Sequence, residues 1–228
     1  MGMGSKIGRE ISRKIRARKL INHNFSIISN TCVGGVISNS LGEQFRSPTV
    51  NLVIHENEFI TFVENLKEYS TCEIEKPNES EIEQYKNFKY PVGILRGKNN
   101  LPDIPLFFVH YGSFDDAVKK WHDRFNRINY DDLYILMDRG MDASDELLDK
   151  FNSLPFKNKV FFTHKQDSQR WKNNFTFSFY NKEKYKNGCL YSSFKRGLAE
   201  YRCLDEFDYT EWLNNGKIQK SNLKIKLK

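Results

Sequence analysis

Ionisable side chains stand directly after three apolar runs of this sequence. One run ends in His110, a second in Asp138 and Arg139, and a third leads through a threonine into His164. Histidine is the usual general acid or base near neutral pH. A neighbouring aspartate can fix the tautomer of a histidine, and an arginine can bind a phosphate or carboxylate through two hydrogen bonds. These residue types indicate proton transfer beside an anionic group.

Helical patterns separate the three runs and predict how these side chains are positioned. The runs cover residues 106–109, 133–137 and 160–162, and amphipathic patterns at 114–127 and 144–152 lie between them. Strands that alternate with single helices favour a mostly parallel sheet. The carboxyl ends of such strands meet at one edge, where ligands bind. We therefore predict a single three-layer α/β domain, with helices flanking the sheet and the candidate residues at one edge.

A polar loop with two glycines follows the first predicted strand, residues 25–29, and precedes a helix expected from residue 36. Its candidate ligand-binding residues are Asn30, Thr31, Gly34 and Gly35. Backbone N–H groups in such a loop and the positive end of the helix favour an anion. We expect the loop to hold the phosphate of a donor, supplemented by Arg139. In the alternative interpretation the glycines serve only the conformation of the chain.

Cys32 lies within this loop, at or near the start of the helix. A helix N-terminus lowers the pKa of a thiol and favours the nucleophilic thiolate. Cys32 is therefore a candidate catalytic nucleophile. The alternative is a small buried side chain without reactivity, which is the more frequent role of a lone cysteine.

The motifs argue against metal chemistry. The glycine loop is neither a Walker loop nor a dinucleotide fingerprint, and no His-Glu-x-x-His or Asp-x-Asp follows a predicted strand. We therefore expect no metal site. Each candidate also has a structural alternative, because a histidine at a strand end is often only hydrogen-bonded and Asp138 can cap a turn. Their joint placement at one edge favours the functional interpretation.

The net charge of +7 is concentrated at the two ends of the chain. Residues 1–22 contain seven basic residues and one acidic residue, and residues 217–228 contain five lysines and no acid. The ends therefore carry +6 and +5, and the remaining residues carry −4. A mildly acidic body argues against a nucleic-acid-binding groove across the fold.

The cysteines and the apolar runs bound the compartment. The four cysteines are widely spaced, and no apolar run approaches the roughly 18 residues that a membrane span requires. Nothing at the start resembles a secretion signal. We expect a cytoplasmic protein with free thiols.

Residues 1–20 predict a basic amphipathic helix outside the main domain. Ile7, Ile11 and Ile15 recur every four residues, with arginines and lysines between them. One interpretation is a terminal helix packed on the domain with a solvated charged face. The other is a helix that lies on an anionic membrane surface. The α/β domain is expected over residues 21–216, followed by a basic tail.

Several short motifs resemble a known bacterial family. They occur in order at residues 28–35, 47–50, 90–93, 108–111 and 154–163, and continue through the Trp121 helix and Asp138-Arg139. With these motifs the chain resembles the family known as domain of unknown function 1919. Members of that family are found in exopolysaccharide and capsule biosynthesis clusters. The resemblance covers about residues 20–170 and implies an α/β fold and a link with surface polysaccharide, but no catalytic residues.

The resemblance and the predicted edge together suggest a function. We expect a metal-independent transferase of surface exopolysaccharide or capsule biosynthesis that uses a nucleotide sugar or acyl-CoA as donor. In this hypothesis His110 or His164 deprotonates the acceptor. The expected partners are polysaccharide-biosynthesis enzymes or a glycan precursor, with no nucleic acid. The alternative is a non-catalytic scaffold held at the inner membrane face through residues 1–20.

Overall fold

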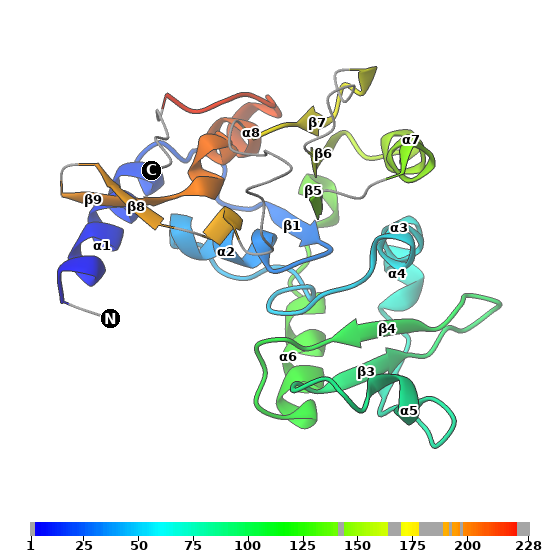
Figure 1. The fold of residues 1–228 in the computed structure, drawn as a ribbon. Helices are drawn as coiled ribbons and strands as arrows, with labels where there is room; N and C mark the ends of the chain where they lie inside the picture. Colours follow the sequence, from blue (N-terminus) through cyan, green and yellow to red (C-terminus); the bar gives the residue numbers. More distant parts are fainter. Residues whose placement is uncertain are drawn as a thin grey trace.

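Four parallel strands form the central sheet of the molecule (Figure 1), which we call sheet A. The computed structural model describes residues 3–140, 144–163, 170–177, 189–191, 193–196 and 198–222. Sheet A has the order β1 (Ser26–Ser29), β5 (Leu133–Gly140), β6 (Asn158–Thr163) and β7 (Asn174–Phe175). Each neighbouring pair is parallel. The prediction of a mostly parallel sheet is therefore confirmed.

Helices cover both faces of sheet A, which makes the α/β domain three-layered. The helices are α2 (Val33–Leu41) and α8 (Tyr209–Asn215) on one face, and α3 (Glu56–Glu64) and α7 (Asp145–Ser153) on the other, while α6 (Phe114–Phe125) lies alongside β3 (Val92–Leu95) and β4 (Ile104–Phe107) (Figure 1). Alternate residues of a strand point to opposite faces. Leu136 and Phe162 accordingly join the core beneath α2 and α8, whereas Met137 and Phe161 join the core beneath α3 and α7.

Local signals in the sequence account for the positions of α6 and α7. Ser113 accepts a hydrogen bond from the Asp116 backbone N–H at 3.2 Å, and Ser144 accepts one from the Leu147 N–H at 3.1 Å. Such capping bonds satisfy backbone donors that the first helical turn leaves without partners. Trp121 on α6 is almost completely buried. The helices predicted at 114–127 and 144–152 therefore form within two residues of their expected bounds.

A second sheet, which we call sheet B, is antiparallel and contains β2 (Ile74–Glu75), β3 (Val92–Leu95) and β4 (Ile104–Phe107). The apolar run at residues 106–109 therefore overlaps β4, and its predicted place in the parallel sheet is wrong. The physical reason is the short connection from β3 to β4. Parallel neighbours need a crossover of about a dozen residues or more, whereas a short loop returns the chain antiparallel.

Short elements complete the chain. They are α4 (Leu66–Tyr69), α5 (Ile82–Tyr85) and the 3-10 helices η1 (Tyr130–Asp132), η3 (Cys189–Tyr191) and η4 (Cys203–Glu206). Near the C-terminus, β8 (Ser193–Arg196) and β9 (Ala199–Arg202) form an antiparallel hairpin. In the described part of the chain, no helix combines the length and the apolar character needed to cross a bilayer.

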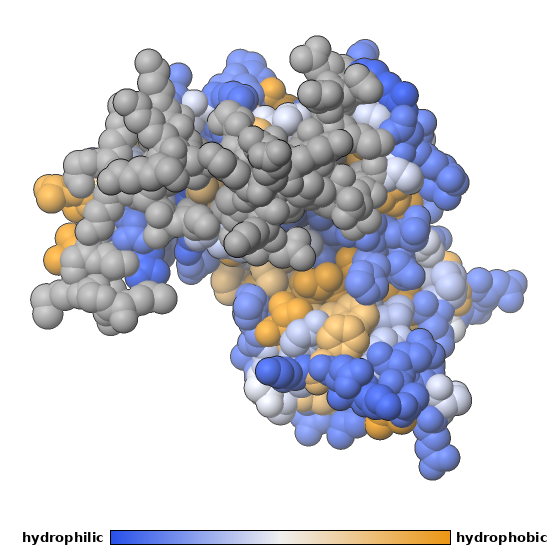
Figure 2. All heavy atoms as spheres, in the orientation of Figure 1, coloured by the Kyte–Doolittle hydropathy of each residue, from blue (hydrophilic) through white to orange (hydrophobic). Residues whose placement is uncertain are grey.

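The N-terminal helix α1 (Met3–Ala17) packs on β9 through small and polar residues. Ser12 is fully buried and donates a hydrogen bond to the backbone oxygen of Glu200. Gly8 is also buried, and a Cβ atom there would lie 3.0 Å from the Leu198 backbone oxygen. The isoleucine stripe is not the packed face, because Ile7 is 57% exposed. Hydrophobic groups accordingly appear in Figure 2 at the left edge, where Figure 1 places α1 and the β8–β9 hairpin.

Candidate functional site

The structure brings Asn30 and Asp138 together at the carboxyl edge of sheet A. The Asn30 Oδ1 atom accepts a hydrogen bond from the backbone N–H of Asp138 at 2.8 Å. The Asn30 Nδ2 atom donates to the backbone oxygen of Asp138 at 3.1 Å. Asn30 is completely buried. Just beyond the end of β1, the side-chain amide of Asn30 thus bonds the backbone of β5 as the backbone of a further strand residue would. Both ends of the Asn30 amide therefore serve a structural role, because they hold the end of β1 to β5.

The glycine loop does not form the expected phosphate cradle. Gly34 and Gly35 are buried within the first turn of α2, and the Gly34 N–H donates to the Ser29 hydroxyl at 3.1 Å. A Cβ atom at Gly34 would lie 2.7 Å from Ser29 Oγ, and one at Gly35 would lie 2.9 Å from Val50. The glycines therefore permit close packing of α2, which is the alternative interpretation. Thr31 is half-buried beside them, and its hydroxyl has no hydrogen-bond partner among the described residues.

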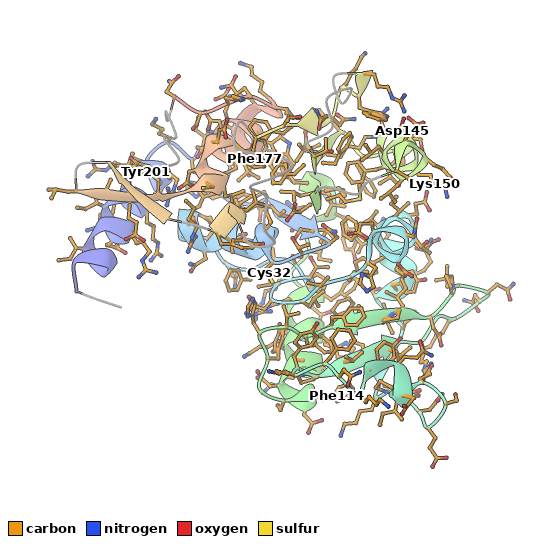
Figure 3. All side chains as sticks on the ribbon, viewed as in Figure 1. Cys32, Phe114, Asp145, Lys150, Phe177 and Tyr201 are labelled. Carbon is orange, nitrogen blue, oxygen red and sulfur yellow. The ribbon has the colours of Figure 1, made fainter. Side chains whose placement is uncertain are left out.

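Cys32 is not the activated thiol that the loop predicts. Burial raises the pKa of the Cys32 thiol to about 11, and its Sγ lies 3.9 Å from the Leu52 backbone oxygen. Loss of hydration disfavours the thiolate. Here it outweighs the opposing effect of the helix start. Figure 3 shows Cys32 by the end of α2, between the two sheets.

Alkylation measures the state of this thiol. With a pKa of about 11, Cys32 should carry about a hundredfold less thiolate at neutral pH than an exposed cysteine. We therefore expect iodoacetamide to modify Cys32 much more slowly than glutathione, with a rate that still rises between pH 8 and pH 10. Peptide mass spectrometry after timed quenching gives the rate. Modification at neutral pH as fast as that of glutathione would contradict the buried, protonated thiol.

Of the three remaining predicted residues, the structure describes the side chain of His110 but not those of Arg139 and His164. His110 follows β4 of sheet B and is exposed. Its backbone N–H donates to the Asn51 backbone oxygen at 3.4 Å. His110 therefore does not stand at the carboxyl edge of sheet A. Arg139 belongs to β5, but its side chain lies outside the described part of the structure, as does the whole of His164. Within the described part of the expected group, the structure brings Asn30 into contact with Asp138.

A cavity elsewhere in the molecule gathers four arginines. It has a volume of about 370 Å³ and lies between α1, the last turn of α2 and β9. Its lining residues are Arg9, Glu10, Arg13, Arg16, Asn39, Ser40, Glu200, Tyr201, Arg202 and Asp205. Figure 3 labels Tyr201 on β9, beside α1. We call this space the arginine cavity.

Two of the four guanidinium groups are held in place by neighbouring elements. Arg16 bonds Asp205 at 2.9 Å, with both side chains largely buried, and its Nε atom has no hydrogen-bond partner among the described residues. The Asp205 carboxylate also accepts hydrogen bonds from the backbone N–H of Arg202 and from the hydroxyl of Tyr209. That hydroxyl is buried, and its burial raises the pKa of Tyr209 well above the usual value. Arg13 lies against Gly42, where a Cβ atom would be 2.8 Å from its Nη2. That position is the C-terminal cap of α2, whose negative end favours a cation.

The arginine cavity has more positive than negative charge. Arg9 forms an ion pair with Glu200 at 3.9 Å, and Arg13 forms one with Glu10 at 3.8 Å. Arg202 donates to the neutral Ser40 hydroxyl at 3.0 Å, and no described carboxylate forms an ion pair with it. Four arginines against three carboxylates leave a formal charge of +1. This arrangement suits an anion with several acceptor oxygens, because guanidinium groups bind phosphate through paired donors.

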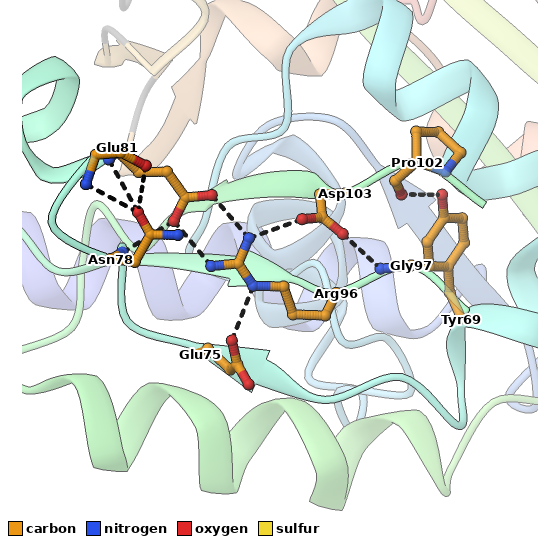
Figure 4. Close-up of polar contacts among 9 residues, drawn as sticks. Tyr69, Glu75, Asn78, Glu81, Arg96, Gly97, Pro102 and Asp103 are labelled. Carbon is orange, nitrogen blue, oxygen red and sulfur yellow. Dashed lines mark hydrogen bonds and ion pairs between the residues drawn. The ribbon is translucent and has the colours of Figure 1, made fainter. Parts of the chain in front are cut away.

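A second charged cluster, around Arg96, differs from the arginine cavity because carboxylates surround its single arginine. Figure 4 shows Arg96 bonded to Glu75 at 2.9 Å, Asp103 at 2.7 Å and Glu81 at 2.7 and 2.8 Å. The Arg96 guanidinium holds the pKa of Glu81 down at about 2. Three carboxylates already surround this arginine, so the cluster fastens the segment around α5 to sheet B and leaves no place for an anion.

The sequence contains one signal for the arginine cavity. Arg9, Arg13 and Arg16 are spaced by four and three residues, and such residues share one side of a helix. Nothing local predicts that Arg202 and Asp205 complete the site from the other end of the chain.

The fold and this site define an α/β protein with an arginine-lined cavity beneath its N-terminal helix. The chain belongs to the family described as Domain of unknown function (DUF1919), whose model matches residues 3–214. It is also 32% identical over 198 residues to a Haemophilus influenzae protein described as "Uncharacterized protein". That alignment covers 87% of this chain and 88% of the relative. The matched region includes α1, α2 and β9, so all walls of the arginine cavity belong to the family domain.

Proposed function

We propose that this protein binds a phosphate-bearing donor in the arginine cavity and acts as a transferase in surface exopolysaccharide or capsule assembly. The polysaccharide context rests on the family resemblance. One observation carries the choice of ligand. The arginine cavity holds four guanidinium groups, and Arg202 pairs only with a neutral hydroxyl among the described residues.

The two donor classes expected from the sequence share the chemistry that this cavity can recognise. A nucleotide sugar and an acyl-CoA both carry a diphosphate group. Arg13, on α1 beside the C-terminal cap of α2, and Arg202, on β9, can each direct N–H groups to the diphosphate oxygens, while Arg16 is anchored by Asp205. Preformed guanidinium groups lose less conformational entropy on binding than flexible ones. We therefore assign phosphate recognition to the cavity, in place of the glycine loop.

The cytoplasm is the compartment that fits this proposal. Activated donors of both classes are intracellular metabolites, and the thiols of Cys32 and Cys72 are free. Free thiols are typical of a reducing compartment.

A thermal-shift panel tests the proposal. We expect at least one of inorganic pyrophosphate, a UDP-sugar and acetyl-CoA to stabilise the protein, by about 2.7 kcal/mol at a hundredfold excess over its dissociation constant. The Arg202→Met variant should lose most of this stabilisation, because it removes the guanidinium that lacks a carboxylate partner. Arg127→Met, at an exposed position beyond α6, is the matched control and should retain it.

Two outcomes would contradict the proposal. One is a panel in which no compound shifts the melting temperature of the native chain. The other is an equal loss of stabilisation in the Arg202 and Arg127 variants, which would indicate general electrostatic attraction without a defined cavity.

A further inference from the structure

The packing of α1 on the protein leaves its isoleucine side chains exposed. Gly8 and Ser12 face the body of the protein, and Arg16 continues this face toward Asp205. The isoleucines stand one position earlier and are turned by about 100° around the helix. Ile7 is 57% exposed and Ile15 is 40% exposed. An apolar stripe of α1 therefore remains open to solvent beside the packed face.

Three exposed apolar side chains, Ile7, Ile15 and Leu198, lie on α1 and the β8–β9 turn. Among the described residues, the large hydrophobic side chains that are exposed are Ile7, Ile15, Ile21, Ile82, Phe88 and Leu198. Leu198 is 83% exposed in the β8–β9 turn, and its backbone oxygen lies against Gly8 of α1. Figure 2 shows hydrophobic residues at the left edge, where Figure 1 places α1 and the hairpin, and a larger hydrophobic area in the lower centre of the view. Grouped exposed apolar residues typically mark an interaction surface.

Positive charges border the stripe. Lys14 is exposed on the turn of α1 that separates Ile11 from Ile15, and Arg18 and Lys19 are exposed directly after the helix. Glu10 is the single acidic residue in the first 22 positions. Exposed isoleucines together with lysines and arginines are typical of helices that lie in the interface of an anionic bilayer. A positively charged surface attracts anionic lipid headgroups and repels basic surfaces.

We propose that α1 and the β8–β9 turn dock this protein on an anionic lipid bilayer. Ile7, Ile15 and Leu198 enter the headgroup boundary, and the neighbouring lysines and arginines contact the lipid phosphates. The isoleucines do not line the arginine cavity, which Arg9 and Arg13 line from the opposite side of the packed face of α1.

Vesicle cosedimentation of the full chain tests the docking surface. We expect binding to vesicles of phosphatidylcholine mixed with phosphatidylglycerol, little binding to phosphatidylcholine alone, and weakening at high salt. The double variant Ile7→Ser/Ile15→Ser should bind the vesicles about tenfold more weakly than the native chain, because two partly inserted isoleucines are lost. Its matched control is Ile82→Ser/Phe88→Ser, which removes two exposed apolar side chains far along the chain, around α5.

The variants are informative only if they fold, so their melting temperatures should equal that of the native chain within the error of the scan. Leu198→Ser offers a second variant outside α1 and should also weaken vesicle binding. The proposal is overturned if the native chain ignores anionic vesicles, or if the α5 control loses as much binding as the α1 variant. The donor compounds should still raise the melting temperature of the isoleucine variants. A failure of membrane docking can therefore be distinguished from a failure of the proposed donor site.

Discussion

Replacing Asn30 with alanine is expected to lower the free energy of unfolding by about 2–4 kcal/mol. The substitution removes both hydrogen bonds between the Asn30 amide and the backbone of Asp138. Asn30 is completely buried, so water cannot readily replace the lost partner, and a small cavity adds to the cost. Urea unfolding followed by circular dichroism gives the difference. We expect donor binding to persist in the variant under conditions where it is folded.

The matched control is Asn57→Ala on the exposed side of α3, which should change stability by less than about 0.5 kcal/mol. An Asn30 variant as stable as this control would show that the amide bridge does not hold the end of β1 to β5. Loss of donor binding at unchanged stability would return Asn30 to the ligand-binding role that the sequence suggests.

Gly34→Ala should destabilise the protein by about 1–3 kcal/mol. Alanine normally stabilises a helix relative to glycine by up to about 1 kcal/mol, so the expected sign is opposite to the intrinsic preference. The added Cβ would lie 2.7 Å from Ser29 Oγ and 2.9 Å from a side-chain carbon of Ile27. Ser29 cannot withdraw without losing its hydrogen bond from the Gly34 N–H. Either α2 or the end of β1 must therefore move.

Gly112→Ala provides the comparison, because a Cβ at Gly112 would have no atom within 4 Å. It should be neutral or stabilising by up to about 1 kcal/mol, through the unfolded chain. A Gly34 variant as stable as the Gly112 variant would contradict the close approach of α2 to β1. A Gly34 variant that is stable but no longer binds the donor would support the phosphate-cradle interpretation instead.

The elements that were predicted correctly are those with a complete local signal. Residues 134–137 of the predicted run are buried because β5 is central in sheet A, with neighbours on both sides. The α6 and α7 helices combine a serine cap with apolar residues at helical spacing, so both the bounds and the buried face are encoded within a few residues. Hydrophobic periodicity and capping depend only on neighbours along the chain.

The site residues were predicted less well because their roles depend on what surrounds them. An apolar run reads the same whether its neighbour is parallel or antiparallel, so β4 and His110 could not be assigned to sheet B from their own residues. A cysteine at a helix start has a lowered pKa only if it keeps its water, and the surroundings of Cys32 remove it. Gly34 looks the same in a loop that cradles an anion and in a helix that packs closely on a strand.

By itself, the sequence determined the parallel α/β core, the capped helices and the basic amphipathic segment at the N-terminus. Only the tertiary structure decided which face of α1 is packed, and that Arg202 and Asp205 meet Arg16 across almost the whole length of the chain. The physical reason is the range of the interactions. Helical periodicity and capping act over a few residues, whereas desolvation, close packing and charge balance depend on every atom that folding brings nearby.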